Sequence, residues 1–449
     1  MRRRATLIGL LVLSQAGAAV AQEGSPRVMR LDEVLRAVKQ NNAHLMAARS
    51  GIEAAEGQHQ MAWTAWQPDV KAIGNITFNN TEAQFDNALL VQQLAQAFQI
   101  TLTPEALAAL PEPIVIQPYV QLAALLTARQ TLFNITALRA PGVASKGVAA
   151  AERAVEAAED EILFQTAQIY SGLVGMKELE SASVRAIEVA EKRIQDAKVQ
   201  LEAGTATKLS VTRAETDKIL AEGQRLSVRE QRRTLLATLR ALAGIDEPIE
   251  VATTPLEESV SIEAQGGIED KSSIKAKVAA AEAAEAAIGL TTWRWLPTLA
   301  ADGTLRYSNV EGFSGERFAA MASVNLIIPL YDSGVRYAEG SIAEAKAAQA
   351  QHELEAARRE AAAALEAVEA RLTTAKDELE QAKAQLRLTT ELVAQVEALV
   401  KNGLATSLDL TDADSKRFGA DRLVVQRTFE LEVAKLRVAQ ARGGKLLKD

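Results

Sequence analysis

The sequence predicts a mainly α-helical protein with a small β part, built from two copies of one strand–strand–helical-hairpin unit. Three observations predict this fold class: an internal repeat, short stretches in which apolar and polar residues alternate, and very long segments free of proline. The composition agrees, since 48% of the residues are hydrophobic but only 4% are aromatic. Small apolar side chains therefore dominate, which suits closely packed helices.

Composition and charge exclude several classes of protein. The chain of 449 residues has 50 basic and 58 acidic side chains and a net charge of -8, which argues against nucleic acid as a partner. There is no Cys, so disulfides and thiolate chemistry are excluded. The three histidines, His44, His59 and His352, lie far apart in the sequence. We therefore expect no metal site, no cofactor and no enzymatic activity, and a secreted hydrolase is disfavoured.

The first 21 residues have the features of a secretory signal peptide. Arg2 to Arg4 form a positive start, Leu7 to Leu13 an apolar run, and Ala19-Val20-Ala21 a small-residue cleavage site. The apolar run is shorter than the roughly 20 residues of a spanning helix, and no later uncharged stretch approaches that length. The sequence thus predicts export, followed by either a soluble state or membrane insertion through strands.

The repeat divides the chain into two similar parts. We expect a first repeat over 22–245, a linker over 246–269 that contains Pro248, Pro255 and Gly266-Gly267, and a second repeat over 270–445. The matching segments are Trp66-Gln67-Pro68 with Trp295-Leu296-Pro297, Leu132-Phe133-Asn134 with Leu330-Tyr331-Asp332, Gly204-to-Leu209 with Gly403-to-Leu408, and Gly244 with Gly443. Because order and spacing persist over the whole length, the repeat indicates a duplicated domain and not a solenoid.

Each repeat is predicted to contain two strands, at about 68–80 and 116–133 and at about 297–309 and 318–331. From Val120 to Leu132 the even positions are apolar except for Gln130, while the odd positions include Gln121, Thr127 and Arg129. This alternation suits either a barrel strand between lipid and water or a soluble sheet with one buried face. Four strands are too few to close a barrel around an aqueous lumen, so a channel would require several chains.

Long helices follow the strands, at about 144–243 and 335–443. Gly204 and Gly403 are expected to end the first helix of each pair in the left-handed conformation, and Thr207 and Thr406 to cap the returning helices. The apolar seam of the second repeat keeps a 3-4 spacing typical of coiled coils. Its members are Leu365, Val368, Leu372, Ala375, Leu379, Ala382, Leu386, Thr389, Val393, Val396 and Val400.

Two further features leave alternatives open. Trp63, Trp66, Trp293 and Trp295 precede the first strand of each repeat, where they suit either an aromatic belt at a membrane boundary or packing at the helix-to-strand junction. The segment 81–117 has no counterpart in the second repeat and is predicted to be an extended extracellular loop.

A signal peptide, a duplicated layout and two strands per copy that lead into long helical hairpins together resemble the TolC family of outer-membrane efflux proteins. The most specific motifs are Leu330-Tyr331-Asp332-Ser333-Gly334 and the turn from Gly403 to Asp414. The resemblance implies a homotrimer whose twelve strands form one outer-membrane β-barrel, continued by a periplasmic α-helical barrel. The alternative from the helices alone is a periplasmic coiled-coil adaptor or scaffold protein.

The resemblance also implies a function and a location. The protein would lie in the outer membrane of a Gram-negative bacterium, in contact with its lipid and with a large periplasmic part. It would be the passive exit duct of a tripartite efflux pump or a type I secretion system. Its partners would be a periplasmic adaptor (membrane fusion protein) and an inner-membrane transporter, not nucleic acid.

Family members place aspartates after the Gly of the second hairpin, and the matching positions are Asp409 and Asp412. Around a threefold axis they would line a cation-selective gate, although Asp409 also suits a capping box with Thr406. Some members carry an Arg where this chain has Ala405, and Asn134-Ile135-Thr136 departs from the family's Asp-Gly-Gly form. The expected adaptor contacts are the hairpin tips, Gly204, Thr205, Ala206, Thr207, Gly403, Leu404, Ala405 and Thr406.

Overall fold

The computed structural model describes residues 27–109, 113–205, 207–252, 266–311 and 315–447. The predicted signal peptide, most of the predicted linker and Ala206 lie outside these residues. The described residues form two compact units. Unit 1 is drawn from 27–40, 166–252 and 379–432, and unit 2 from 41–165, 266–378 and 433–447.

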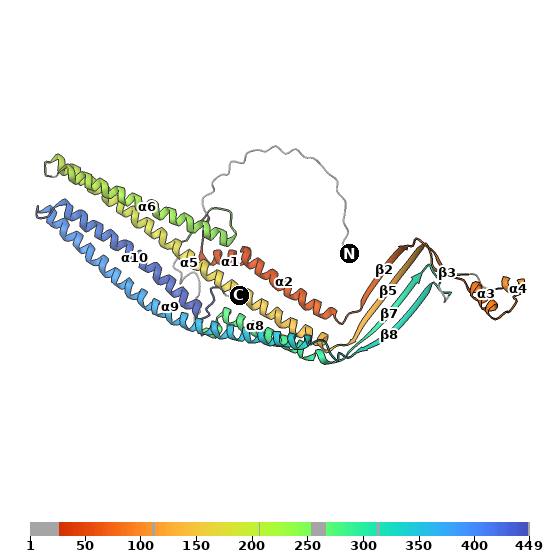
Figure 1. The fold of residues 1–449 in the computed structure, drawn as a ribbon. Coiled ribbons are helices and arrows are strands. Elements are labelled where there is room, and N and C mark those ends of the chain that lie inside the picture. Colours follow the sequence, from red (N-terminus) through yellow and green to blue (C-terminus); the bar gives the residue numbers. More distant parts are fainter. Residues whose placement is uncertain (1–26, 110–112, 206, 253–265, 312–314, 448–449) are drawn as a thin grey trace, which may run out of the picture. The chain divides into compact units, whose positions relative to one another are not determined.

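The helices and strands follow the same order twice (Figure 1). The first repeat contains β1 (Arg27–Met29), α1 (Leu31–Asn41), α2 (Ala43–Thr64), β2 (Asp69–Phe78), β3 (Ala83–Phe85), α3 (Asn87–Ala97), α4 (Pro104–Ala108), β4 (Ile114–Gln117), β5 (Val120–Phe133), α5 (Ile135–Glu202), α6 (Lys208–Ala243) and β6 (Ile249–Val251). The second contains η1 (Ile268–Asp270), α8 (Ser272–Thr292), η2 (Trp293–Trp295), β7 (Thr298–Ser308), β8 (Phe318–Ile327), α9 (Val335–Lys401) and α10 (Ser407–Ala441). The series α2–β2–β5–α5–α6 thus corresponds to α8–β7–β8–α9–α10.

A four-stranded antiparallel sheet in unit 2 joins the two repeats. Its strand order is β2-β5-β7-β8, so the pairing of β5 with β7 connects the copies. The register aligns Ala72 with Leu126, Leu126 with Leu305, and Leu305 with Ala320. Residues paired directly across an antiparallel ladder point to the same face, so the alternating patterns of all four strands are in phase.

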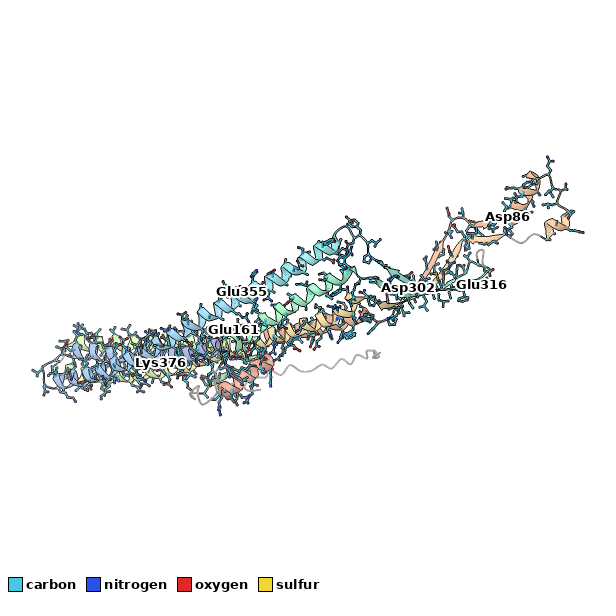
Figure 2. All side chains as sticks on the ribbon, turned by 90° about the horizontal axis from the view of Figure 1, so that it is seen from below. Asp86, Glu161, Asp302, Glu316, Glu355 and Lys376 are labelled. Carbon is cyan, nitrogen blue, oxygen red and sulfur yellow. The ribbon has the colours of Figure 1, made fainter. Side chains whose placement is uncertain are left out.

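Unit 2 also contains the packing of α8 against α9. The residues at its centre are Ile274, Ala281, Leu354 and Ala361. The alanines allow the two backbones to approach closely, and Lys277 and Glu353 add an ion pair of 2.8 Å across the contact. Figure 2 shows the side chains along this part of the chain, with Glu355 on α9 and Glu161 on α5.

Unit 1 has a small core around a two-stranded parallel sheet. β1 pairs with β6, and α1 buries Leu31, Val34, Leu35 and Val38 completely, at the spacing of one helix face. The Tyr170 hydroxyl lies 3.0 Å from the Met29 carbonyl oxygen and 3.1 Å from that of Ala252, and burial raises the pKa of Tyr170 to about 12. Residues 249–251 were expected in the linker, but they form β6 because their pairing with β1 buries Val251 against this core.

The first long helix, α5, begins earlier in the sequence than expected. α5 begins at Ile135 and not near 144, because the Asn134 side chain accepts hydrogen bonds from the backbone of Thr136 and Ala137. The helix therefore includes Pro141, which removes one backbone hydrogen bond within the second turn. In α9, all eleven residues of the predicted seam are buried or half-buried.

The segment between β2 and β5 is more regular than an extended loop. β3 and β4 pair to form a stalk that continues the β2–β5 hairpin, and α3 and α4 lie at its end (Figure 1). Asn79 fixes the base of the stalk. Its backbone N–H donates to the Tyr119 carbonyl at 2.8 Å, and its side-chain Nδ2 donates to the Pro118 carbonyl at 2.7 Å.

None of the helices in the described part of the chain combines the length and the apolar character that a membrane crossing requires.

Candidate functional site

The two hairpin turns have the same geometry in both repeats. Gly204 and Gly403 are left-handed, with φ of 73° and 74°, as the repeat predicts. In each turn the second residue donates a backbone hydrogen bond to the carbonyl five residues earlier, Thr205 to Gln200 at 2.9 Å and Leu404 to Leu399 at 2.9 Å. A left-handed glycine and this long hydrogen bond define a Schellman motif, which reverses the chain sharply.

The two tips lie beside each other in unit 1. The Ser407 hydroxyl is 3.3 Å from the Ser210 hydroxyl, which joins the start of α10 to the start of α6. Leu404 is 75% exposed, so the second tip presents an apolar side chain to solvent. The prediction that Thr207 caps α6 through its side chain is wrong, because its hydroxyl lies near the Ser210 hydroxyl and makes no cap bond.

Asp409 forms a capping box with Thr406 at the start of α10. Its carboxylate accepts from the Thr406 backbone N–H at 2.8 Å and from the Thr406 hydroxyl at 2.7 Å. These two bonds lower the pKa of Asp409, the hydroxyl contributing most. Asp412 is exposed and pairs with Lys416 at 2.7 Å, one helical turn further along. Both carboxylates thus lie in solvent near the tip, and Asp409 has a structural role that exists within a single chain.

A partly buried ion-pair network near the tips was not predicted from the sequence. Arg193 on α5 donates to Asp414 on α10 at 2.8 Å and to Glu397 on α9 at 2.6 Å. The Arg193 side chain is 20% exposed and that of Asp414 only 7%. Burial acts to lower the pKa of Arg193, but the bonds to Asp414 and Glu397 outweigh it and raise the pKa overall. One guanidinium therefore links the first hairpin to both helices of the second.

A groove of about 270 Å³ lies beside this network in unit 1. Its charged lining consists of Arg193, Arg422, Asp217 and Asp414. Val189, Leu220 and Phe418 contribute apolar surface. Burial, and then the nearby Asp414 carboxylate, raise the pKa of Asp217. The groove is thus a partly apolar recess between α5, α6 and α10, with two carboxylates close to one another.

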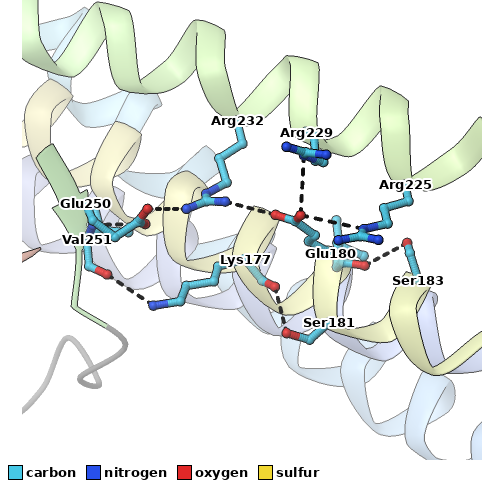
Figure 3. A network of polar contacts seen from close by, with 10 residues as sticks. Lys177, Glu180, Ser181, Ser183, Arg225, Arg229, Arg232, Glu250 and Val251 are labelled. Carbon is cyan, nitrogen blue, oxygen red and sulfur yellow. Dashed lines mark hydrogen bonds and ion pairs between the residues drawn. The ribbon is translucent and has the colours of Figure 1, made fainter. Parts of the chain in front are cut away.

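A second network in unit 1 fixes α6 against α5 near the small sheet (Figure 3). Glu180 on α5 lies near three arginines of α6, and its bond to Arg232 is the shortest of the three at 2.9 Å. Arg232 also bonds to Glu250 on β6, and Lys177 donates to the Val251 carbonyl at 3.4 Å. These bonds attach β6 to both helices of the first hairpin.

One face of the four-stranded sheet in unit 2 carries the charges of the sheet, together with the apolar Ile73, Leu125 and Met321. Every charged residue of the four strands lies on it, and the register places Asp69, Arg129 and Asp302 in one row across β2, β5 and β7. Arg129 is 3.6 Å from Asp302, and the Asn325 amide of β8 donates to Asp302 at 2.7 Å. Cross-strand pairs of this kind stabilise the sheet and keep its charges on one side.

The opposite face is apolar and exposed. Ile76, Val324 and Leu326 are each about 60% exposed, at 61%, 65% and 61%. A soluble sheet would bury such a face, so the expectation of one buried face is not met among the described residues. β2 and β8 end the sheet on either side, and their outer edges carry backbone groups that pair with no described strand.

The junction between β8 and α9 contains a buried arginine. The Arg336 guanidinium lies 2.9 Å from Asp332 and 3.5 Å above the Trp295 ring, which in turn packs edge-on against Tyr337 at 5.4 Å. Arg139 lies 4.8 Å above the Trp293 ring. Both tryptophans thus pack at the helix-to-strand junction, which was one of the two alternatives for them.

The comparisons with known proteins agree with this arrangement. Residues 268–444 match the family described as outer membrane efflux protein. Comparison with curated proteins finds no match. The solved outer membrane protein VceC of Vibrio cholerae is 17% identical, with a TM-score of 0.71 and coverage of 92% of this chain and 96% of that one. The open-state MtrE outer membrane channel of Neisseria gonorrhoeae is 16% identical, with a TM-score of 0.73 and coverage of 92% and 89%. The CmeC outer membrane channel of Campylobacter jejuni is 14% identical, with a TM-score of 0.70 and coverage of 99% and 96%.

The resemblance to the TolC family is thereby confirmed. Residues 268–444 match the outer membrane efflux protein family, and 92% of the chain is covered by the fold of the solved outer-membrane channels VceC and MtrE. The predicted fold class of a single chain, mainly α with a small β part in a duplicated strand–strand–helical-hairpin layout, is confirmed with it.

Proposed function

We propose that the protein is a passive exit duct through the outer membrane, formed by three copies of the chain, within a tripartite efflux pump or a type I secretion system. No catalysis is part of this proposal. The observation that carries it is the four-stranded sheet, whose apolar patterns coincide on one exposed face and whose charges coincide on the other. A wall between lipid and an aqueous lumen requires this division.

The sheet edges support the trimer. Pairing β8 of one copy with β2 of the next would satisfy both open edges, and three copies would supply twelve strands to one barrel. The periplasmic adaptor alternative does not account for a sheet whose apolar face is exposed over four strands, so the duct is the better supported of the two.

The hairpin tips are the proposed contact with a periplasmic adaptor, which would connect the duct to an inner-membrane transporter. The tip residues of the two turns are Gly, Ala and Thr except for Leu404, whose exposed side chain gives a partner helix an apolar anchor. Ala206 lies outside the described residues and remains in the proposal on the strength of the sequence repeat.

Asp409 and Asp412 are proposed to line the periplasmic constriction of the trimer. The lowered pKa of Asp409 keeps this carboxylate ionised, which supports a preference for cations. Capping and gating are compatible, because both bonds from Thr406 go to Oδ2 of Asp409 and neither uses Oδ1.

The lipid-facing assignment can be tested with two neighbouring alanines on opposite faces of β5. Ala124→Arg places a charge on the apolar face between Gly74 and Tyr307, where we expect a cost of about 2–4 kcal/mol and loss of the protein from outer membranes. Ala123→Arg places the same charge on the polar face between Asn75 and Ser308 and should assemble normally. Equal assembly of both variants would refute the duct.

The gate assignment can be separated from capping by comparing substitutions at Asp409 in reconstituted channels. Asp409→Asn removes the charge but keeps an oxygen that can accept the Thr406 bonds, whereas Asp409→Ala removes both. A gate predicts reduced cation selectivity in Asp409→Asn, in Asp409→Ala and in Asp412→Asn. If Asp409→Asn and Asp412→Asn keep the selectivity of the unchanged chain, both residues are structural only.

A further inference from the structure

The insertion between β2 and β5 exposes an unusual apolar helix. Leu90, Leu94 and Phe98 follow one another at i, i+4 and i+8 along α3 and its end, with exposed fractions of 46%, 49% and 72%. We call Leu90, Leu94 and Phe98 the α3 stripe. Leu89 is 54% exposed but lies about 100° around the helix from this row. A short surface helix with a row of three large exposed apolar side chains indicates a contact surface.

The stripe is held in place by ordered structure. The Asp86 carboxylate caps α3 by accepting from Ala88 at 2.8 Å and Leu89 at 3.1 Å, and the β3–β4 stalk carries the helix beyond the end of β2 and β5. Figure 2 shows Asp86 in this outer part, past Asp302 on the sheet. The start of α3 is therefore capped, and the paired strands β3 and β4 connect the helix to the sheet.

The charges near the stripe argue against an anionic membrane surface as its partner. Between Lys71 and Arg129 the sequence has no Lys or Arg, and its acids are Glu82, Asp86, Glu105 and Glu112. Interfacial helices that bind anionic lipid carry Lys or Arg on their polar face. From Asn87 to Ile100 the helix and its end carry no charge at all, so two copies can approach without like-charge repulsion.

The position of α3 in the chain brings copies of it together. α3 follows β2, which is an edge strand of the sheet and is where the next copy would pair in the proposed trimer. The second repeat has only a short connection between β7 and β8, so the described part of each chain contains one such helix. Three copies would thus place three identical uncharged helices around one mouth.

We propose that the α3 stripe is the contact surface for α3 of a second copy of this chain, so that three helices form a collar over the outer mouth of the duct. The inference rests on the proposed trimer. Apolar stripes at i, i+4 and i+8 spacing are self-complementary between helices, and burial against a neighbouring copy removes the exposed leucines from water.

The absence of cysteine from the sequence makes a clean cross-linking test possible. In outer membranes that contain the full-length Leu94→Cys chain, mild oxidation should yield a disulfide-linked dimer, because a disulfide requires the two Cα atoms within about 7 Å. Because three thiols around a threefold axis can form only one disulfide, we expect at most about two thirds of the chains to become cross-linked. Phe98→Cys, on the same stripe, should behave alike.

Gln96→Cys is the matched control, since Gln96 is exposed on the opposite side of the same helix. We expect its dimer yield to be at least about tenfold lower, and Leu90→Gln should reduce the yield of Leu94→Cys several-fold because it interrupts the stripe. Equal yields from Leu94→Cys and Gln96→Cys would overturn the proposal.

The same membranes also test whether lipid, and not a second copy of the chain, covers the stripe. They further separate failure of the collar from failure of the proposed duct. Strong quenching of a fluorophore on the Leu94→Cys thiol by brominated lipid would show that the stripe lies in the membrane, and would overturn the collar. A trimer on native gels that supports export without the cross-link would refute the collar and leave the duct intact. Failure of the unchanged chain to form a trimer would refute the duct itself.

Discussion

The Arg193 network gives a quantitative test of how the two hairpins are held together. Arg193→Ala leaves the Asp414 carboxylate, which is 7% exposed, without its charged partner, and the Asp414 Oδ1 atom is buried without a hydrogen bond in the described chain even before the change. Removing one member of a fully buried pair costs about 3–5 kcal/mol, and exposed pairs contribute about 0–1 kcal/mol. Since Arg193 is 20% and Glu397 40% exposed, we expect about 2–4 kcal/mol, mostly from Asp414.

The control variant is Arg185→Ala. Arg185 pairs with Asp421 at 3.1 Å and connects the same two helices, α5 and α10, but its side chain is 51% exposed. We expect a cost of about 0–1 kcal/mol for this change. The two variants therefore compare a buried and an exposed ion pair in the same helix contact.

Hydrogen exchange of the backbone amides of residues 405–421, followed by mass spectrometry on the full-length protein, measures the local opening free energy. Arg193→Ala should accelerate exchange there by roughly 30- to 700-fold, since about 1.4 kcal/mol corresponds to tenfold, and Arg185→Ala by less than about tenfold. Adding Asp414→Ala to Arg193→Ala should recover part of the loss, because the orphaned carboxylate is removed. Equal acceleration in the two single variants would refute the reasoning that burial makes the Arg193 network important.

Three further changes test other parts of the structure. Gly403→Ala should cost about 1–2 kcal/mol in thermal unfolding because of its left-handed φ of 74°, and Gly403→Asn should cost less, since Asn tolerates this conformation. Asp217→Asn should raise the melting temperature at neutral pH but not near pH 3. The pKa of Asp217 is raised in the folded state, so the ionised carboxylate destabilises the fold above that pKa. This destabilisation disappears as the pH falls through the pKa. Arg336→Ala should destabilise the β8–α9 junction by about 2–4 kcal/mol and shift the Trp295 fluorescence to the red, and Arg336→Lys should restore little because Lys lacks the planar fork.

Several features followed from local sequence rules. The left-handed glycines at the hairpin turns were predictable because a helix that reverses requires a residue without Cβ at that position. The capping box of Asp409 was predictable because its spacing from Thr406 is a local signature. The early start of α5 was missed, because Pro141 and Gly142 favour a helix boundary locally and only the Asn134 cap and the burial of Pro141 carry the helix past them.

The sequence also could not reveal contacts between residues far apart in the chain. Arg193 lies in a helix with many charges, and nothing in its neighbourhood marks it as buried. Its partner Asp414 is 221 residues away, and the only available signal was an acidic residue directly after Ala413, which is one of the small residues of α10. β6 was missed for the same reason, since a three-residue strand has no periodicity and depends on β1.

The sequence by itself determined the duplicated order of helices and strands, the alternation along each strand and the positions of the hairpin turns, because periodicity, capping and the left-handed glycines act over a few residues. Only the tertiary structure decided that the four alternating patterns fall on one face, since a shift of one residue in any strand pairing would have reversed that strand. It also decided which charges are buried, because desolvation depends on the packing of helices that the chain brings together over hundreds of residues.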